Sequence, residues 1–224
     1  MTPKERPILF SGPMVRALLD GRKTQTRRVV KGPHFQPDAV KPNDGGGVRV
    51  FSRGREVQLQ RVACPYGVIG DRLWVREAWA PVPATAYRHS EGVQQVVNPD
   101  DPYLAAIFAA GWDRSIPKWK PSIHMPRWAC RLVLEITEVR VERLLDCSDA
   151  DAQAEGLQWV TPGMWSVDRS LPIIGDDARQ VYFELWDHIN GAGAAEANPW
   201  VWAVSFRVLS DEERQASIRG GEAS

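Results

Sequence analysis

A lysine, a threonine and an arginine are closely spaced in the segment Gly21-Arg22-Lys23-Thr24-Gln25-Thr26-Arg27-Arg28. A threonine hydroxyl is a poor nucleophile unless a base removes its proton. A lysine can be that base when it is partly neutral, and both burial and neighbouring cations lower its pKa. Lys23, Thr26 and Arg28 therefore have the chemistry of a small reactive pocket, provided that the chain turns inward after Gly21.

The same segment is the densest group of cations in the chain. The sequence has 28 basic and 28 acidic residues and a formal net charge of zero. Proteins that coat duplex DNA usually carry a large positive excess, so any contact with nucleic acid must come from a local patch. Arg22, Arg27 and Arg28 are the candidates for phosphate contacts, and a solvated basic edge is the alternative interpretation.

Tryptophan is unusually frequent, with ten residues among 224. Most of these side chains are expected to pack in the core. One or two would serve as platforms on which a base stacks. Trp74 and Trp128 are the candidates, and Arg76 is a further candidate for binding nucleic acid.

The elements on either side of the basic segment must position it. Residues 7–11 are predicted to form a strand, and residues 14–19 a short helix that stops at Gly21. The cations then follow a helix C-terminus, where the helix dipole favours positive charge. Residues 48–62 predict a hairpin. Residues 72–79 predict a strand with Leu73, Val75 and Glu77 on one side and Trp74 and Arg76 on the other.

Three later elements are also indicated. Residues 128–143 alternate as a strand, but the apolar phase shifts near Thr137 and Glu138, which predicts a bulge or a bend. Residues 177–189 predict a helix with Val181, Leu185, Trp186 and Ile189 on its buried stripe, and residues 200–208 a final strand. The order of elements differs from regular βαβ alternation and favours an α+β protein built on a small bent β-barrel.

A short predicted helix carries a candidate acid. Ser148 is a good N-cap, and the helix should run to Glu155 and stop at Gly156. A glutamate in the last turn of a helix lies at the negative end of the helix dipole and should have a positive partner. Lys23 is the candidate partner, and a solvated glutamate is the alternative.

Several motifs resemble the ASCH domain, a member of the PUA-like superfamily. The pattern Gly21-x-Lys23-x-x-Thr26-x-Arg28 is similar to the ASCH signature, with Thr26 at the usual acidic position. Bacterial N4-acetylcytidine amidohydrolases of this family carry the same Gly-Arg-Lys-Thr-x-Thr-x-Arg run. The segments at 70–77, 121–128 and 198–202 also resemble prophage-encoded ASCH-like proteins.

The resemblance implies roles for three residues. In the amidohydrolases the matching lysine is the base and the second threonine is the nucleophile, which implies these roles for Lys23 and Thr26. The segment Ala152-Gln153-Ala154-Glu155-Gly156-Leu157 is similar to the one that carries their catalytic glutamate, which places the acid at Glu155. Arg28 would hold an oxyanion or a phosphate.

The resemblance also implies the organisation of the chain. A single ASCH, PUA-like domain is expected over residues 1–210, followed by a polar tail at 211–224. Insertions are expected at about 32–66, 80–122 and 158–176. The first should begin as a loop over 32–47, and the second should be irregular, with a short helix at 102–110.

Three functions remain open at this point. The first is binding of RNA, single-stranded nucleic acid or a modified nucleoside, with affinity that falls as salt rises. The second is an amidohydrolase that removes an acyl group from N4-acylated cytidine, with ribonuclease activity as a lesser alternative implied by the family. The third is a phage structural or host-interaction protein whose tryptophans form an interface.

The sequence also gives expectations for cofactors and cellular context. No cofactor and no metal are expected, because Cys64, His124 and Cys130 have no local ligand spacing. Three sparse cysteines are typical of a reducing cytoplasm. No apolar run approaches the roughly 20 residues that cross a bilayer. A cytoplasmic protein without a membrane partner is therefore expected.

Overall fold

The computed structural model describes residues 3–31, 39–42, 47–52, 55–114, 118–168 and 170–214. Its centre is a five-stranded mixed sheet with strand order β1-β6-β10-β14-β2. The strands of this sheet are β1 (Glu5–Leu9), β6 (Arg72–Arg76), β10 (Val133–Arg143), β14 (Trp200–Val208) and β2 (Gln25–Val29). Strand β1 pairs with β6 in parallel, and the other pairs are antiparallel.

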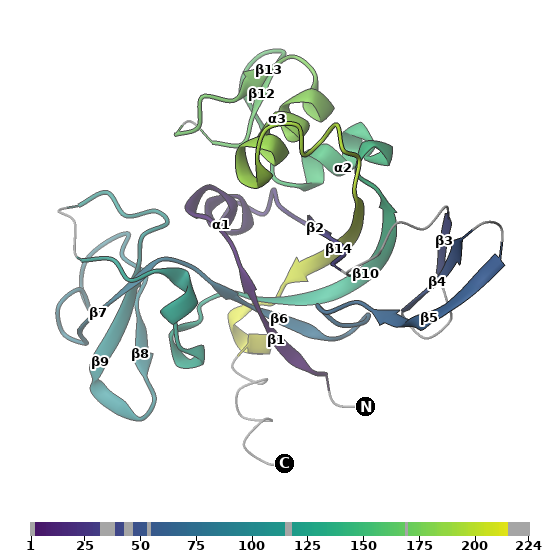
Figure 1. The fold of residues 1–224 in the computed structure, drawn as a ribbon. Helices are drawn as coiled ribbons and strands as arrows, with labels where there is room; N and C mark the ends of the chain where they lie inside the picture. The colour runs from purple at the N-terminus through teal and green to yellow at the C-terminus, as the bar shows by residue number, and fades with distance from the viewer. Residues whose placement is uncertain are drawn as a thin grey trace.

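The sheet curves strongly but stays open. Figure 1 shows β10 and β14 bending together beneath the helices. Strands β1 and β2 are its two edges, so the described strands do not close into the barrel expected from the sequence. The broader prediction of an α+β protein is confirmed.

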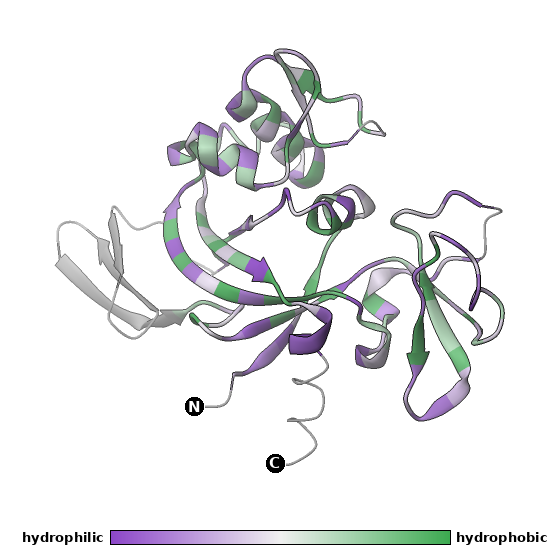
Figure 2. Ribbon diagram, turned by 180° about the vertical axis from the view of Figure 1, so that it is seen from behind, coloured by the Kyte–Doolittle hydropathy of each residue, from purple (hydrophilic) through white to green (hydrophobic). Residues whose placement is uncertain are grey.

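A bulge contributes to this curvature. The register between β10 and β14 shifts between Ile136 and Glu138, where the sequence predicted a bulge. A bulge bends its strand and increases the local twist. Figure 2 shows hydrophilic and hydrophobic residues alternating along the curved strands. This alternation gives the sheet one face for the main core.

Two helices cover the concave face. Helix α1 (Gly12–Leu19) buries Met14 and Leu18, and helix α3 (Ala178–Asn190) buries Leu185 and Trp186 in the same core. Both helices were predicted. The buried stripe of α3 is shorter than expected, because Ile189 is 61% exposed near the end of the helix.

A short helix lies beside them, between the bent strand and a small sheet. Helix α2 (Asp149–Ala154) begins at Ser148, whose hydroxyl accepts from the backbone N–H of Asp151 in a capping box. Short 3-10 helices occur at Ser122–His124, Arg127–Ala129 and Leu144–Asp146. Within the described residues, no helix is both long and apolar enough to cross a membrane.

The predicted insertions contain three small antiparallel sheets. Their strands are β3 (Ala39–Pro42), β4 (Gly47–Ser52) and β5 (Arg55–Ala63); β7 (Trp79–Pro83), β8 (Val96–Asn98) and β9 (Asp101–Phe108); and β11 (Gln158–Thr161), β12 (Met164–Ser166) and β13 (Ile174–Gly175). The hairpin predicted over 48–62 is confirmed by β4 and β5.

Two predictions for these insertions are wrong. Residues 102–110 belong mainly to strand β9, not to a helix, because this apolar run lies between β7 and β8 with residues 105–108 buried. The expected loop at 32–47 contains strand β3, which pairs with β4. Residues 32–38 and 43–46 of that loop lie outside the described residues.

Candidate functional site

Lys23 and Glu155 form a buried ion pair. Lys23 Nζ donates to Glu155 Oε2 at 2.6 Å and to the backbone oxygen of Glu155 at 2.8 Å. The two residues are 1% and 4% exposed. The contact predicted from the sequence is therefore confirmed, between the segment that follows α1 and the last turn of α2.

Two glycines allow the chain to bring this pair together. Gly21 adopts φ +71° just after α1 and turns the chain towards Lys23. Gly156 adopts φ +107°, and a Cβ there would lie 2.9 Å from Ala17 Cβ and 3.2 Å from Lys23 Cβ. A side chain at position 156 would therefore be strained and would also displace the end of α2 from Lys23.

Glu155 has further partners on its second oxygen. The Tyr182 hydroxyl donates to Oε1 at 3.2 Å, and Arg27 Nη1 lies 3.4 Å from the same atom. Burial lowers the pKa of Lys23, while attraction to Glu155 opposes part of this effect. Burial also raises the pKa of Tyr182, so this phenol stays protonated and able to donate.

Arg27 lies inside the protein, not on an exposed edge. It is 1% exposed, and its guanidinium donates to Glu142 at 2.7 and 2.9 Å and to Gln25 at 2.6 Å. Burial alone would lower the pKa of Arg27, but Glu155 and the other nearby acids raise it. Its contacts make Arg27 an internal partner of carboxylates, which differs from the phosphate contact expected from the sequence.

Thr26 and Arg28 are neighbours on strand β2. Arg28 Nη1 donates to Thr26 Oγ1 at 2.9 Å, and Arg28 Nη2 donates to the backbone oxygen of Leu9 at 3.0 Å. The Arg28 guanidinium also lies over the Phe10 ring, 5.3 Å from its centroid. Thr26 is 1% exposed. The hydroxyl therefore already accepts a hydrogen bond from a cation and keeps its own proton to donate.

A cavity of about 230 Å³ opens over the ion pair. Its charged lining comes from Lys23, Arg27, Arg28 and Glu155. Thr26 is not a lining residue and is joined to the cavity only through its hydrogen bond with Arg28. Its apolar wall comes from helices α1 and α3 and from the end of β1. The main contributors to that wall are Phe10, Met14, Tyr182, Leu185, Trp186 and Ile189. A charged floor beneath aromatic and aliphatic walls suits a small ligand with both apolar and polar groups.

Sequence reasoning missed the contributions of Tyr182 and Trp186. The Trp186 indole N–H is buried without a hydrogen-bond partner within the described part of the chain. The helical periodicity of α3 identified Trp186 only as core. A buried donor without a partner is unusual. Here it belongs to a residue that lines a cavity.

The remaining candidates lie away from this cavity. Arg22 pairs with Asp20 at 2.9 Å and donates to the backbone oxygen of Gly156, so it supports the turn after α1. Trp74 alternates with the buried Leu73 and Val75 and therefore points from the other face of the sheet.

That other face has its own small cluster of aromatic and cationic side chains. Trp128 packs edge-on against Trp79, with 6.0 Å between ring centroids. Arg76 lies over the Trp74 ring at 5.4 Å and donates to the backbone oxygen of Ser122 at 3.0 Å. Trp74, Arg76 and Trp128 are therefore separate from the residues around Lys23.

The cysteines considered as zinc ligands lie in different parts of the core. Cys64 packs in the main core and Cys130 in the second cluster, beside Trp79 and Val133. Across the described ranges, no group of three or more His, Cys, Asp and Glu side chains is placed to hold a metal ion.

Comparisons with protein-family models, with curated proteins and with solved structures found no match to this chain.

Proposed function

We propose that this chain is an ASCH-like, PUA-like protein that binds RNA or a modified nucleobase in the cavity over Lys23 and Glu155. One observation carries the proposal, namely the buried 2.6 Å ion pair at the floor of a cavity with aromatic walls. Burying two charges costs on the order of several kcal/mol per ion. A buried ion pair is therefore weak evidence that the pair serves only to stabilise the fold. Perturbed, paired charges in a cleft are typical of functional sites.

The size and lining of the cavity support a ring-sized ligand. A volume of about 230 Å³ is smaller than a typical pocket for a drug-sized molecule, which has roughly 300–1,000 Å³. Phe10, Tyr182 and Trp186 supply aromatic surface for a planar group. Arg28 supplies donors for carbonyl or phosphate oxygens.

Calorimetric titration of the full chain tests the proposal. The probes are N4-acetylcytidine, cytidine and a short single-stranded RNA at two salt concentrations. We expect at least one probe to bind, with RNA affinity falling as salt rises. Arg28→Gln should weaken binding by about tenfold, equivalent to about 1.4 kcal/mol.

A matched variant distinguishes this cavity from general loss of charge. Arg207→Gln removes one arginine from an exposed position on β14, where it pairs with Glu135 and Glu213. Its affinity should stay within about twofold of the parent protein. The proposal fails if folded protein binds none of the probes, or if Arg28→Gln and Arg207→Gln have equal effects.

We propose amidohydrolase activity as the second candidate. The observation that favours it is the hydrogen bond from Arg28 to Thr26 Oγ1, together with the lowered pKa of Lys23. Thr26 Oγ would attack the acetyl carbonyl carbon, and Lys23 would accept the hydroxyl proton and pass it to N4 as the C–N bond breaks. Water would then hydrolyse the threonine ester, so N4-acetylcytidine and water become cytidine and acetate.

Two threonines on one segment provide the test of this chemistry. Thr26 is buried and accepts a hydrogen bond from Arg28, whereas Thr24 is exposed. We expect Thr26→Ala to abolish release of acetate and Thr24→Ala to leave its rate unchanged. No acetate release by the parent protein, or equal rates in both variants, excludes this candidate while leaving the binding proposal intact.

A further inference from the structure

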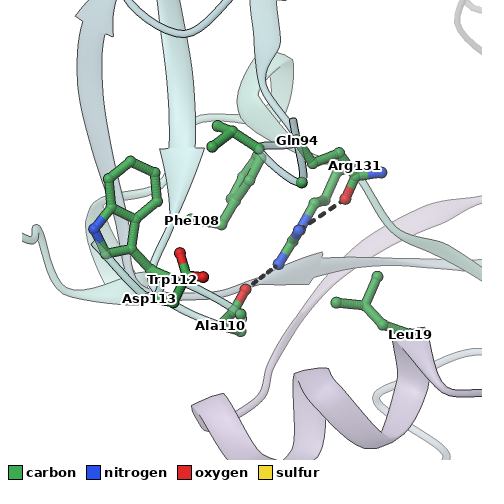
Figure 3. A pocket seen from close by; sticks show the side chains of 10 residues that line it. Leu19, Gln94, Phe108, Ala110, Trp112, Asp113 and Arg131 are labelled. Atoms are coloured by element: carbon green, nitrogen blue, oxygen red, sulfur yellow. Dashed lines mark hydrogen bonds between the residues drawn. The ribbon is translucent and has the colours of Figure 1, made fainter. Parts of the chain in front are cut away.

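A second and larger cavity lies on the other side of α1, against the sheet formed by β7, β9 and β8. Its volume is about 430 Å³. Figure 3 shows Leu19 projecting from the end of α1 and Arg131 joined by hydrogen bonds to Gln94 and Ala110. The cavity is therefore bounded by the main domain on one side and by the expected insertion on the other.

Arg131 organises this cavity. Its Nε and Nη2 donate to the two carboxylate oxygens of Glu77, each at 2.8 Å, in a bidentate pair. Its guanidinium carbon lies 4.2 Å from the centroid of the Phe108 ring. It also bonds to the two segments of the insertion that line the cavity, residues 92–94 and 108–113. Nη1 donates to Gln94 Oε1 at 2.8 Å, and Nη2 donates to the backbone oxygen of Ala110 at 3.1 Å.

The charges around the cavity disfavour an anion. Glu77 is 1% exposed and balances the charge of Arg131, which is 8% exposed. Asp113 remains as an acid in the lining, and its side chain is 87% exposed. Asp113 Oδ1 in turn lies 3.8 Å from Arg114 Nε. A phosphate or carboxylate would therefore meet two ion pairs and no unpaired cation among the lining residues, whereas an uncharged ligand needs no such cation.

The edges of the cavity offer both donors and acceptors. A guanidinium has five N–H groups, and the bonds to Glu77, Gln94 and Ala110 use four, leaving one on Nη1 in the described structure. The Gln94 amide is exposed and the Asp113 carboxylate is an acceptor. Trp112 adds an aromatic surface to the same lining.

We propose that this cavity is a second ligand site that takes an uncharged, planar heteroaromatic ring with hydrogen-bond donors and acceptors on its edge, the chemistry of a nucleobase. Arg, Gln and Asp side chains are the groups that pair with base edges, and aromatic rings stack on base faces. This site shares no lining residue with the cavity over Lys23. It therefore does not depend on the function proposed above.

Titration of Arg28→Gln protein with uncharged nucleosides tests this proposal, since that background weakens binding at the first cavity and leaves the buried ion pair intact. The probes are adenosine, guanosine, cytidine and uridine. We expect at least one to bind and Leu19→Trp to weaken binding by about tenfold or more, because the larger ring enters the mouth of the cavity from an exposed position. Asp113→Ala should weaken binding by about tenfold through loss of a charged acceptor.

Leu145→Trp is the matched control, because Leu145 is a similarly exposed leucine that lines neither cavity. It should leave nucleoside affinity unchanged. The proposal is overturned if no nucleoside binds, or if Leu19→Trp and Leu145→Trp have the same effect. It is also overturned if a nucleoside 5′-monophosphate binds more than about tenfold tighter than its nucleoside, since that result indicates an anion site.

Discussion

Lys23 Nζ donates to both the carboxylate and the backbone oxygen of Glu155, at 2.6 and 2.8 Å, across 132 positions of sequence. A short backbone bridge between the same residues accompanies the side-chain contact. The ion pair therefore also joins the two segments that follow α1 and α2. Its loss should affect both the folding free energy and the shape of the cavity.

Lys23→Met should destabilise the protein by about 3–5 kcal/mol, because it leaves the buried Glu155 carboxylate without its closest cation. Glu155→Met should have a similar cost. The double variant should cost less than the sum of the two, because neither charge is then left alone. Urea unfolding of all four proteins measures this coupling, and additive costs would show that the two residues act independently.

Gly156→Ala should lower the free energy of unfolding by more than Gly163→Ala. Both glycines have positive φ, +107° and +82°, so each alanine pays a conformational cost of about 1–2 kcal/mol. Only position 156 also has a neighbour, Ala17 Cβ, at 2.9 Å from a new Cβ; position 163 has open space. Urea midpoints of the two variants compare these costs. Equal losses of unfolding free energy in the two variants would mean that α1 and α2 move apart to admit the new Cβ at no further cost.

Ser148→Ala should cost about 1 kcal/mol, because the Ser148 hydroxyl caps α2. Ser11→Ala at the start of α1 is the control, since Ser11 makes no side-chain cap hydrogen bond. Its effect should stay within about 0.5 kcal/mol. Thermal unfolding measures both. A Ser148→Ala cost no larger than that of Ser11→Ala would contradict the capping box.

Cys147→Ala should become less costly at high pH. Burial raises the pKa of the Cys147 thiol from 9.0 to about 12. The folded state therefore holds this proton more tightly than the unfolded chain, and the thiol contributes stability below pH 9.0 that is lost as pH rises towards 12. The loss is at most about 1.4 kcal/mol per pH unit. Unfolding at pH 8 and pH 10.5 measures it, and a cost independent of pH would show that the thiol titrates normally.

The contact between Lys23 and Glu155 could be predicted because each residue carries a local signal. Glu155 sits at the unfavourable end of a capped helix, and Gly21 marks a turn before Lys23. Tyr182 had no such signal. It lies on the buried stripe of a regular helix. A hydrophobic periodicity of 3.6 residues shows that such a residue is buried, but it does not show that the hydroxyl contacts a carboxylate elsewhere in the sequence.

Strand β9 shows a different limit of sequence reasoning. Residues 105–108 are all buried, at 0–3% exposure, because neighbouring strands and the second core cluster surround them. A short strand that is buried on both faces has no alternation, so it resembles a helix segment in sequence. The bulge in β10 was predictable for the opposite reason, since the apolar residues alternate clearly on both sides of it: Leu134 and Ile136 before the bulge, and Val139 and Val141 after it, face the same main core.

The edge strand β2 has a consequence for the order in which this protein is made. Residues 25–29 find their sheet partner in residues 201–205, so the N-terminal segment that bears Lys23 and Thr26 gains its neighbour only after most of the chain has been synthesised. Pairing over such a separation is slow, because a long loop must close first. A nascent chain held before β14 would therefore display an unpaired strand edge at the future site, the kind of surface that chaperones bind.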